Sequence, residues 1–198
     1  MSGLCLAVVA IVCVVVGCLW CTCSARGNRL VSIIKHVVLK LPISQSVAES
    51  HMNHLRATLG ACQIPFFLTE GTALGAIREH RIIPHDTDID IGIDIEYRQK
   101  FKACAAPLFR KLGFKSYRHS DTFLTLIKDY LYIDIMFMGH TGTCVDISCQ
   151  QMRRYHNNRI KATLYGQEYD CLPVEFIEEL YGPDWRTPKR EKPEQRRA

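Results

Sequence analysis

The spacing of apolar and polar residues divides most of the chain into short helices and strands. Apolar residues recur at helical spacing over 44–60, which predicts an amphipathic helix that ends at Gly60. Over 88–95 every second residue is isoleucine, which predicts a strand with one apolar face. Similar reasoning predicts further helices over 73–80, 97–112 (bent at Pro107) and 173–181, and strands over 65–69, 114–117, 122–127, 131–138, 160–165 and 168–172. Residues 139–158 look rich in loops. This order predicts an α+β fold, a small mixed β-sheet with packed helices.

The amino end has a different pattern. Residues 4–23 contain no charged side chain, and about 20 apolar residues suffice to span a bilayer as a helix. We therefore expect a membrane anchor over 1–25, although Cys23-Ser24-Ala25 also resembles a signal-peptide cleavage site. A stem over 26–43 follows. Its four basic residues favour a cytosolic body by the positive-inside rule.

Charge and cysteine content exclude some functions. The chain has 198 residues and a formal net charge of +5, but residues 183–198 hold six basic and three acidic residues. The remaining body is nearly neutral, which argues against a nucleic-acid-binding protein, and the basic tail over 189–198 is expected to be disordered. The body has no C-x-x-C pair that would suggest zinc. Cys144 and Cys149 are spaced to close a small disulfide loop if the body lies in an oxidising compartment.

Three aspartates fall within five positions in the segment PHDTDIDIGI, residues 84–93. A calcium loop starting at Asp86 would need glycine where Ile91 stands and glutamate where Tyr97 stands. An aspartyl-phosphate enzyme would have its apolar strand before the first acid, whereas here the strand follows. In a strand, Asp88 and Asp90 point to one face and can share Mg²⁺ or Mn²⁺. Asp134 is a single acid in a second apolar strand. It would complete a three-carboxylate site if the two strands are neighbours. The alternative is a solvated acidic sheet face.

A Gly-Thr pair precedes these acids. Gly71 and Thr72 stand where a turn leads into the predicted helix, and backbone N–H groups at a helix start bind anions. Nucleotidyltransferase-type sites have this same order: a glycine and a threonine, then a helix, then two acids on the next strand. In such sites the turn holds phosphates and the carboxylates hold metal.

These segments resemble a known family. The sequence EGTALGAIREHRIIPHDTDIDIGI (70–93) is similar to the LicD/fukutin-related group of nucleotidyltransferase-fold phosphotransferases, as are YIDIMF (132–137) and LPVEFIEELYGPDWRTP (172–188). The resemblance implies a LicD-like catalytic domain over 44–188. It implies transfer of a phosphorylated alcohol, such as phosphocholine or ribitol phosphate, from a CDP-linked donor to a glycan hydroxyl, with release of CMP. It also favours a lumenal body in the Golgi or endoplasmic reticulum, anchored in the membrane through residues 4–23.

The resemblance also assigns roles to residues. Asp86, Asp88, Asp90 and Asp134 would bind Mg²⁺ or Mn²⁺, with Asp134 as third ligand or general base. Substrate would be bound by Gly71, Thr72, Arg78, Tyr181, Trp185 and Arg186. His85 stands where many relatives have tryptophan. Two other interpretations stay open: a nucleotidyltransferase that adds a nucleotide to a small molecule, and an inactive family member that acts as a binding module.

Overall fold

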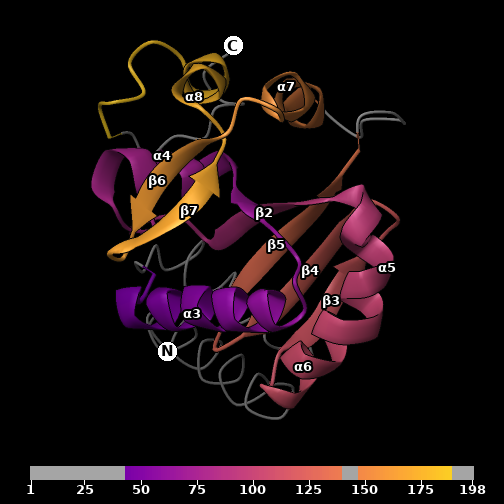
Figure 1. The fold of residues 1–198 in the computed structure, drawn as a ribbon. Coiled ribbons are helices and arrows are strands. Elements are labelled where there is room, and N and C mark those ends of the chain that lie inside the picture. Colours follow the sequence, from indigo (N-terminus) through magenta and orange to yellow (C-terminus); the bar gives the residue numbers. More distant parts are fainter. Residues whose placement is uncertain (1–42, 140–146, 189–198) are drawn as a thin grey trace, which may run out of the picture.

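A computed structural model describes residues 43–139 and 147–188, and its centre is a seven-stranded mixed β-sheet (Figure 1). The strand order is β3-β4-β5-β2-β1-β7-β6. β2 runs parallel to β5 and antiparallel to β1, while β1 runs parallel to β7. The strands are β1 (Phe67–Leu68), β2 (Asp88–Asp94), β3 (Lys115–His119), β4 (Phe123–Lys128), β5 (Leu131–Met138), β6 (Ile160–Leu164) and β7 (Gln167–Cys171). The predicted α+β class is confirmed.

The helices form two groups around this sheet. Along one side lie α3 (Gln45–Ala61), α5 (Arg98–Lys100) and α6 (Ala106–Lys111), and near the other end lie α4 (Glu70–Glu79), α7 (Ile147–Tyr155) and α8 (Val174–Tyr181) (Figure 1). α3 packs on α6, while α4 packs on β2 and β6 and touches α8. Ala48, Met52, Leu55 and Leu59 on α3 are buried, as the helical spacing predicts.

β2 is buried on both faces. Ile89, Ile91 and Ile93 are fully buried on one face, and Asp90 and Gly92 are buried on the other. The strand ends one residue earlier than predicted, at Asp94. Ile95 begins the short 3₁₀ turn η2 (Ile95–Tyr97) and is 40% exposed, because the chain leaves the sheet there.

Two helical regions differ from the prediction. The helix expected over 97–112 contains a π turn, η3 (Phe101–Ala105), which ends shortly before Pro107. Proline has no N–H to give to the preceding turn, so the irregularity lies where a hydrogen bond is missing. Helix α7 (Ile147–Tyr155) lies in the region expected to be loop-rich. Its nine residues are mostly polar and too few for a stable isolated helix, and its packing against α8 supplies the missing stabilisation.

A disulfide joins Cys62, after α3, to Cys104 in η3. The sequence did not indicate this pair, because the two cysteines are 42 residues apart and only the fold brings them together. Cys171 is a buried free thiol. Cys144 lies outside the described residues, so its predicted disulfide with Cys149 stays a prediction.

Among residues 43–139 and 147–188, we find no helix with the length and apolar character needed to cross a membrane. The anchor predicted over 4–23 and the tail predicted over 189–198 lie outside the described residues.

Candidate active site

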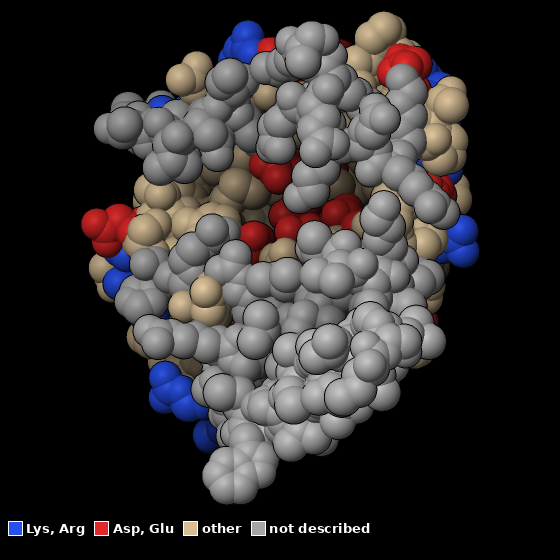
Figure 2. Space-filling view, turned by 180° about the vertical axis from the view of Figure 1, so that it is seen from behind, with Lys and Arg blue, Asp and Glu red and all other residues tan. Residues whose placement is uncertain are grey.

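The candidate site is built on the adjacent parallel strands β2 and β5. Their register places Asp90 directly opposite Asp134, and Asp88 lies two residues before Asp90 on the same face. Asp88, Asp90 and Asp134 each offer a carboxylate oxygen, and these oxygens all lie within 4.8 Å of one another. The strand pattern predicted this meeting of three carboxylates. Figure 2 shows Asp and Glu side chains gathered in a hollow on the face opposite to that of Figure 1.

Burial and like charge make this group electrostatically costly. Asp90 and Asp134 are almost entirely buried, and Asp88 is half-buried. Burial raises the pKa of Asp90 well above its usual value, and so do the negative charges of Asp88, Glu70, Asp86 and Asp134. Three converging carboxylate oxygens are the hard ligands that Mg²⁺ and Mn²⁺ prefer, so the donor set fits a divalent cation, which would also relieve the repulsion.

Helix α4 begins beside these acids. The helix starts at Glu70, so Gly71 and Thr72 lie in its first turn and not in a preceding loop. Thr72 is fully buried, and its Oγ1 accepts a hydrogen bond of 2.8 Å from the backbone N–H of Asp90. This bond fixes the start of α4 against β2.

Asp86 lies against the same helix start. A Cβ added to Gly71 would come within 2.2 Å of Asp86 Oδ2, so only glycine lets the carboxylate approach this closely. Asp86 Oδ1 accepts a hydrogen bond from the backbone N–H of Thr87. Within the described residues, the three-carboxylate group that meets at one point does not include Asp86. Its predicted role as a metal ligand stays a prediction.

Two further groups face the acids. Glu70 has a φ of 45°, a value uncommon for a residue other than glycine, and its charge acts on Asp90. Glu70 was not among the site residues predicted from the sequence, although an acid just before Gly-Thr was a visible signal. Burial raises the pKa of the Tyr181 phenol well above its usual range, as do the charges of Asp86, Glu70, Asp90 and Asp88. The Tyr181 hydroxyl therefore keeps its proton beside the acidic group.

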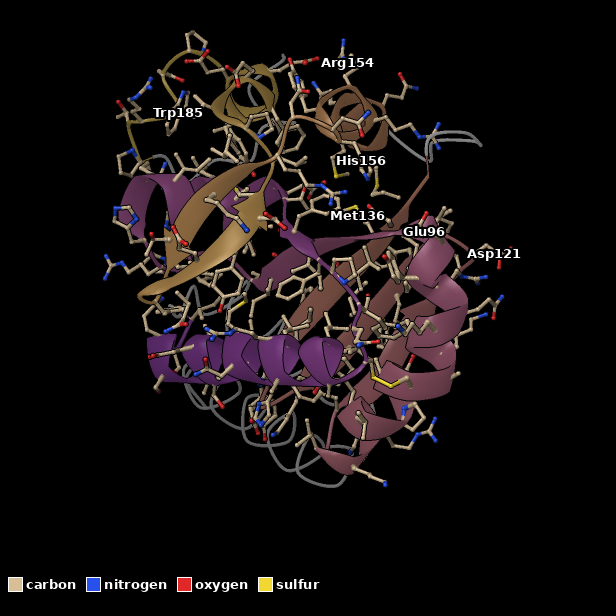
Figure 3. All side chains as sticks on the ribbon, in the orientation of Figure 1. Glu96, Asp121, Met136, Arg154, His156 and Trp185 are labelled. Carbon is tan, nitrogen blue, oxygen red and sulfur yellow. A yellow bond between two sulfur atoms is a disulfide. The ribbon has the colours of Figure 1, made fainter. Side chains whose placement is uncertain are left out.

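The other predicted substrate-binding residues contact one another. Arg78 Nη1 donates to the backbone oxygen of Trp185 at 3.0 Å, and the same guanidinium pairs with Glu79. Trp185 lies on the loop after α8 and is only 4% exposed, and the Arg186 guanidinium stacks over its ring at 4.2 Å (Figure 3). The Arg78 side chain is only 9% exposed. Its contact with the Trp185 carbonyl ties this loop to α4, and its predicted role in substrate binding stays a prediction. His85, the departure from the family pattern, is exposed.

The carboxyl end of β2 holds a second charged group. Asp94 Oδ1 is 2.6 Å from both His156 Nε2 and Arg159 Nη2. Burial alone would raise the pKa of Asp94, but the hydrogen bonds from Arg159 and His156 outweigh it and lower this pKa. The Arg159 guanidinium also lies 3.9 Å from the centre of the Phe67 ring. His156 follows α7 (Figure 3), so these contacts fasten the end of that helix to the sheet.

A family model described as LicD/FKTN/FKRP, nucleotidyltransferase domain, matches residues 63–181. Ribitol-5-phosphate transferase FKTN from Macaca fascicularis is 30% identical over 150 residues, which cover 66% of this chain and 31% of that protein. The Homo sapiens protein of the same name is 29% identical with the same coverage. The chain thus spans about a third of the length of these curated relatives.

The solution structure of the antibiotic-resistance factor ANT(2'')-Ia is also similar. Its TM-score is 0.50 at 15% sequence identity, and the match covers 74% of this chain and 80% of that chain. At this identity the likeness concerns the fold alone.

Proposed function

Because this chain belongs to the LicD/FKTN/FKRP family and carries its nucleotidyltransferase domain, we propose that it is a phosphotransferase acting on a CDP-linked donor. The donor carries a phosphorylated alcohol of the ribitol-phosphate or phosphocholine type, and the acceptor is a glycan hydroxyl. Two relatives are named ribitol-5-phosphate transferase, which favours ribitol phosphate as the transferred group.

The meeting of Asp88, Asp90 and Asp134 is the observation that carries this proposal. In the proposed site these carboxylates hold Mg²⁺ or Mn²⁺. A bound divalent ion would supply neutralisation of the donor diphosphate and of the charge that develops during transfer. A solvated acidic surface would not need Asp90 and Asp134 to be almost completely buried.

The reaction is a substitution at phosphorus. The acceptor hydroxyl oxygen forms a bond to the phosphorus of the alcohol phosphate, and the bond from this phosphorus to the bridging oxygen breaks. CMP leaves with that oxygen, and the hydroxyl proton passes to a base. Asp134 is either the third ligand or this base. Positioning of both substrates in line, together with electrostatic stabilisation of the transferred phosphate, supplies most of the rate gain that such a site can offer.

The first turn of α4 binds the donor phosphates in this proposal. The N–H groups near Gly71 and Thr72 supply hydrogen bonds, and the helix dipole favours negative charge there. Asp86 borders this turn as an accessory ligand. Tyr181, Trp185 and Arg186 close the site on the nucleotide side, and Arg78 holds the loop of Trp185 and Arg186 in place.

We also propose the predicted domain plan and location: an anchor over 1–25, a stem over 26–43, a catalytic domain over 44–188 and a basic tail over 189–198. The burial of α3 residues in the core supports a domain that begins before the family match. The Cys62–Cys104 disulfide supports a lumenal body in the Golgi or endoplasmic reticulum, because disulfides persist in oxidising compartments. This outweighs the basic residues that follow the predicted anchor.

The test is a donor panel offered to the full-length protein. CDP-ribitol, CDP-choline and CTP are each incubated with a glycan acceptor and Mn²⁺ or Mg²⁺, and released CMP and pyrophosphate are quantified. An Asp88→Ala/Asp90→Ala variant tests the site. Asp121→Ala is the matched control, because Asp121 is an exposed acid whose contact is with Arg98.

We expect CMP release with a CDP-alcohol that requires metal, survives Asp121→Ala and is lost in the double variant. Pyrophosphate release from CTP would instead indicate nucleotide transfer. Binding of a donor without release of either product would indicate an inactive binding module. Activity that persists without metal and without both aspartates would refute the proposed site.

A further inference from the structure

Thr125 contacts the candidate site from a third strand. The β4–β5 register places Thr125 directly opposite Asp134. Its Oγ1 donates a hydrogen bond of 2.7 Å to Asp134 Oδ1, and both residues are buried, at 4% and 8% exposure. A buried carboxylate with a short hydroxyl contact has one of its two oxygens held in place.

The three strands β4, β5 and β2 put their polar residues in one line. Thr125, Asp134 and Asp90 occupy paired positions on neighbouring strands, with Asp134 in the middle. Thr125 therefore lies on the side of Asp134 away from Asp90, and the bond to Oδ1 fixes how the carboxylate is turned relative to the other acids. Thr125 acts on the site through its hydrogen bond to Asp134.

The surroundings of Thr125 show that its hydroxyl is the significant group. Ile127, two residues later on β4 and therefore on the same face as Thr125, is a buried apolar residue. Valine has nearly the same shape and suits a strand equally well, so packing alone does not call for a hydroxyl at this position. In the sequence Thr125 is flanked by Phe123, Leu124, Leu126 and Ile127, but only the register reveals that it lies opposite the acid.

We infer that Thr125 is a positioning residue that orients Asp134 for divalent-cation binding. This inference rests on the proposed function, since it assumes that the three carboxylates hold a metal. Hydrogen-bond partners behind a metal ligand typically change metal affinity by about 10–100-fold when they are removed.

The experiment measures Mn²⁺ affinity of the full-length protein by electron paramagnetic resonance of free Mn²⁺. The variants are Thr125→Val, which removes the hydroxyl, and Thr125→Ser, which keeps it. Thr163→Val is the matched control, because Thr163 is a strand threonine on β6 at the far end of the strand order. Thermal unfolding of each metal-free variant reports whether it is folded.

We expect Thr125→Val to weaken Mn²⁺ binding about 10-fold or more, Thr125→Ser to restore it to within about 2-fold, and Thr163→Val to leave it unchanged. Tight binding by folded Thr125→Val would overturn the inference while leaving the proposed metal site intact. Equal weakening by Thr163→Val would also overturn it, since the effect would then be general. If the wild-type protein binds no Mn²⁺, the proposed metal site fails and the role of Thr125 fails with it.

Discussion

The backbone N–H of Asp90 donates its hydrogen bond to the side chain of Thr72. An acid central to the candidate site is thereby tied to the helix start that is proposed to hold phosphate. The two halves of the site, carboxylates on β2 and N–H groups on α4, are held in a fixed relation by one buried contact.

Replacing Thr72 with valine should cost about 1–3 kcal/mol of unfolding free energy, because it leaves the buried N–H of Asp90 without an acceptor. Thr72→Ser should recover most of this loss. Urea unfolding measures both variants. Thr58→Val on α3 is the control for removing a buried helix hydroxyl far from the acids, and an equal cost there would show that the Asp90 contact contributes little.

Replacing Asp90 with asparagine should stabilise the metal-free protein and abolish its response to metal. The substitution puts a neutral amide in place of a buried carboxyl group whose charged form is disfavoured by burial and by four other carboxylates. For a domain of this size, a gain of about 1 kcal/mol raises Tm by about 2–4 °C. The Tm of the wild-type protein should rise on addition of Mn²⁺, because a ligand that binds only the folded state stabilises that state.

Thermal unfolding with EDTA and with Mn²⁺ compares the two proteins. The exposed Asp121→Asn variant should behave as wild type in both conditions, since its ion pair with Arg98 is at the surface. If Asp90→Asn lowers the metal-free Tm, repulsion among the acids is not the dominant effect.

His51 should make stability fall in mild acid. It is fully buried on α3 beside the ring of Phe114, and burial lowers its pKa to about 4, against the opposing effect of Asp129. The unfolded chain has a histidine pKa near 6.5, so below that pH it takes up a proton that the folded protein does not. His51 therefore leaves the free energy of unfolding unchanged above about pH 6.5 and lowers it progressively as the pH falls toward 4.

Between pH 7 and pH 5 the loss from His51 should be about 2 kcal/mol. Urea unfolding at the two pH values compares wild type with His51→Leu, in which this part of the pH dependence should disappear. His54→Leu is the control, because His54 contacts the same Phe114 ring. An unchanged pH dependence in His51→Leu would assign the acid sensitivity to other groups.

Arg78→Lys should loosen the loop that carries Trp185. Lysine cannot pair with Glu79 and donate to the Trp185 carbonyl in the same forked geometry. We expect a red shift of Trp185 fluorescence, measured in a Trp20→Phe background, and about a 10-fold fall in transfer rate. Arg81→Lys is the matched control for Arg78→Lys, because Arg81 also pairs with Glu79 but is half exposed. Equal effects of the two substitutions would mean that the Trp185 contact is unimportant.

Local patterns in the sequence were sufficient to predict the three acids of the site, but not the residues that contact them. The alternation around Asp88 and Asp90 and the lone acid at Asp134 predicted a shared site, because strands place every second residue on one face. The role of Thr125 and the Cys62–Cys104 pair depend on strand register or on contacts between distant segments, which a single sequence does not display. Helix α7 was missed because its stability comes from packing on α8 and from contacts such as Thr69 with Met152.

The placement of β1 has a consequence for the order in which the domain can form during synthesis. This two-residue strand lies between β2, made soon after it, and β7, which ends at Cys171. Until the ribosome has added β7, one edge of β1 has no neighbour from that strand, and an open strand edge invites pairing with other chains. Strands β2 and β5, which carry the three aspartates, are synthesised before β7. The sheet around them is therefore completed only by some of the last residues of the domain. A nascent chain arrested before Gln167 therefore contains all three aspartates of the site but lacks the strand that joins β1 to β6.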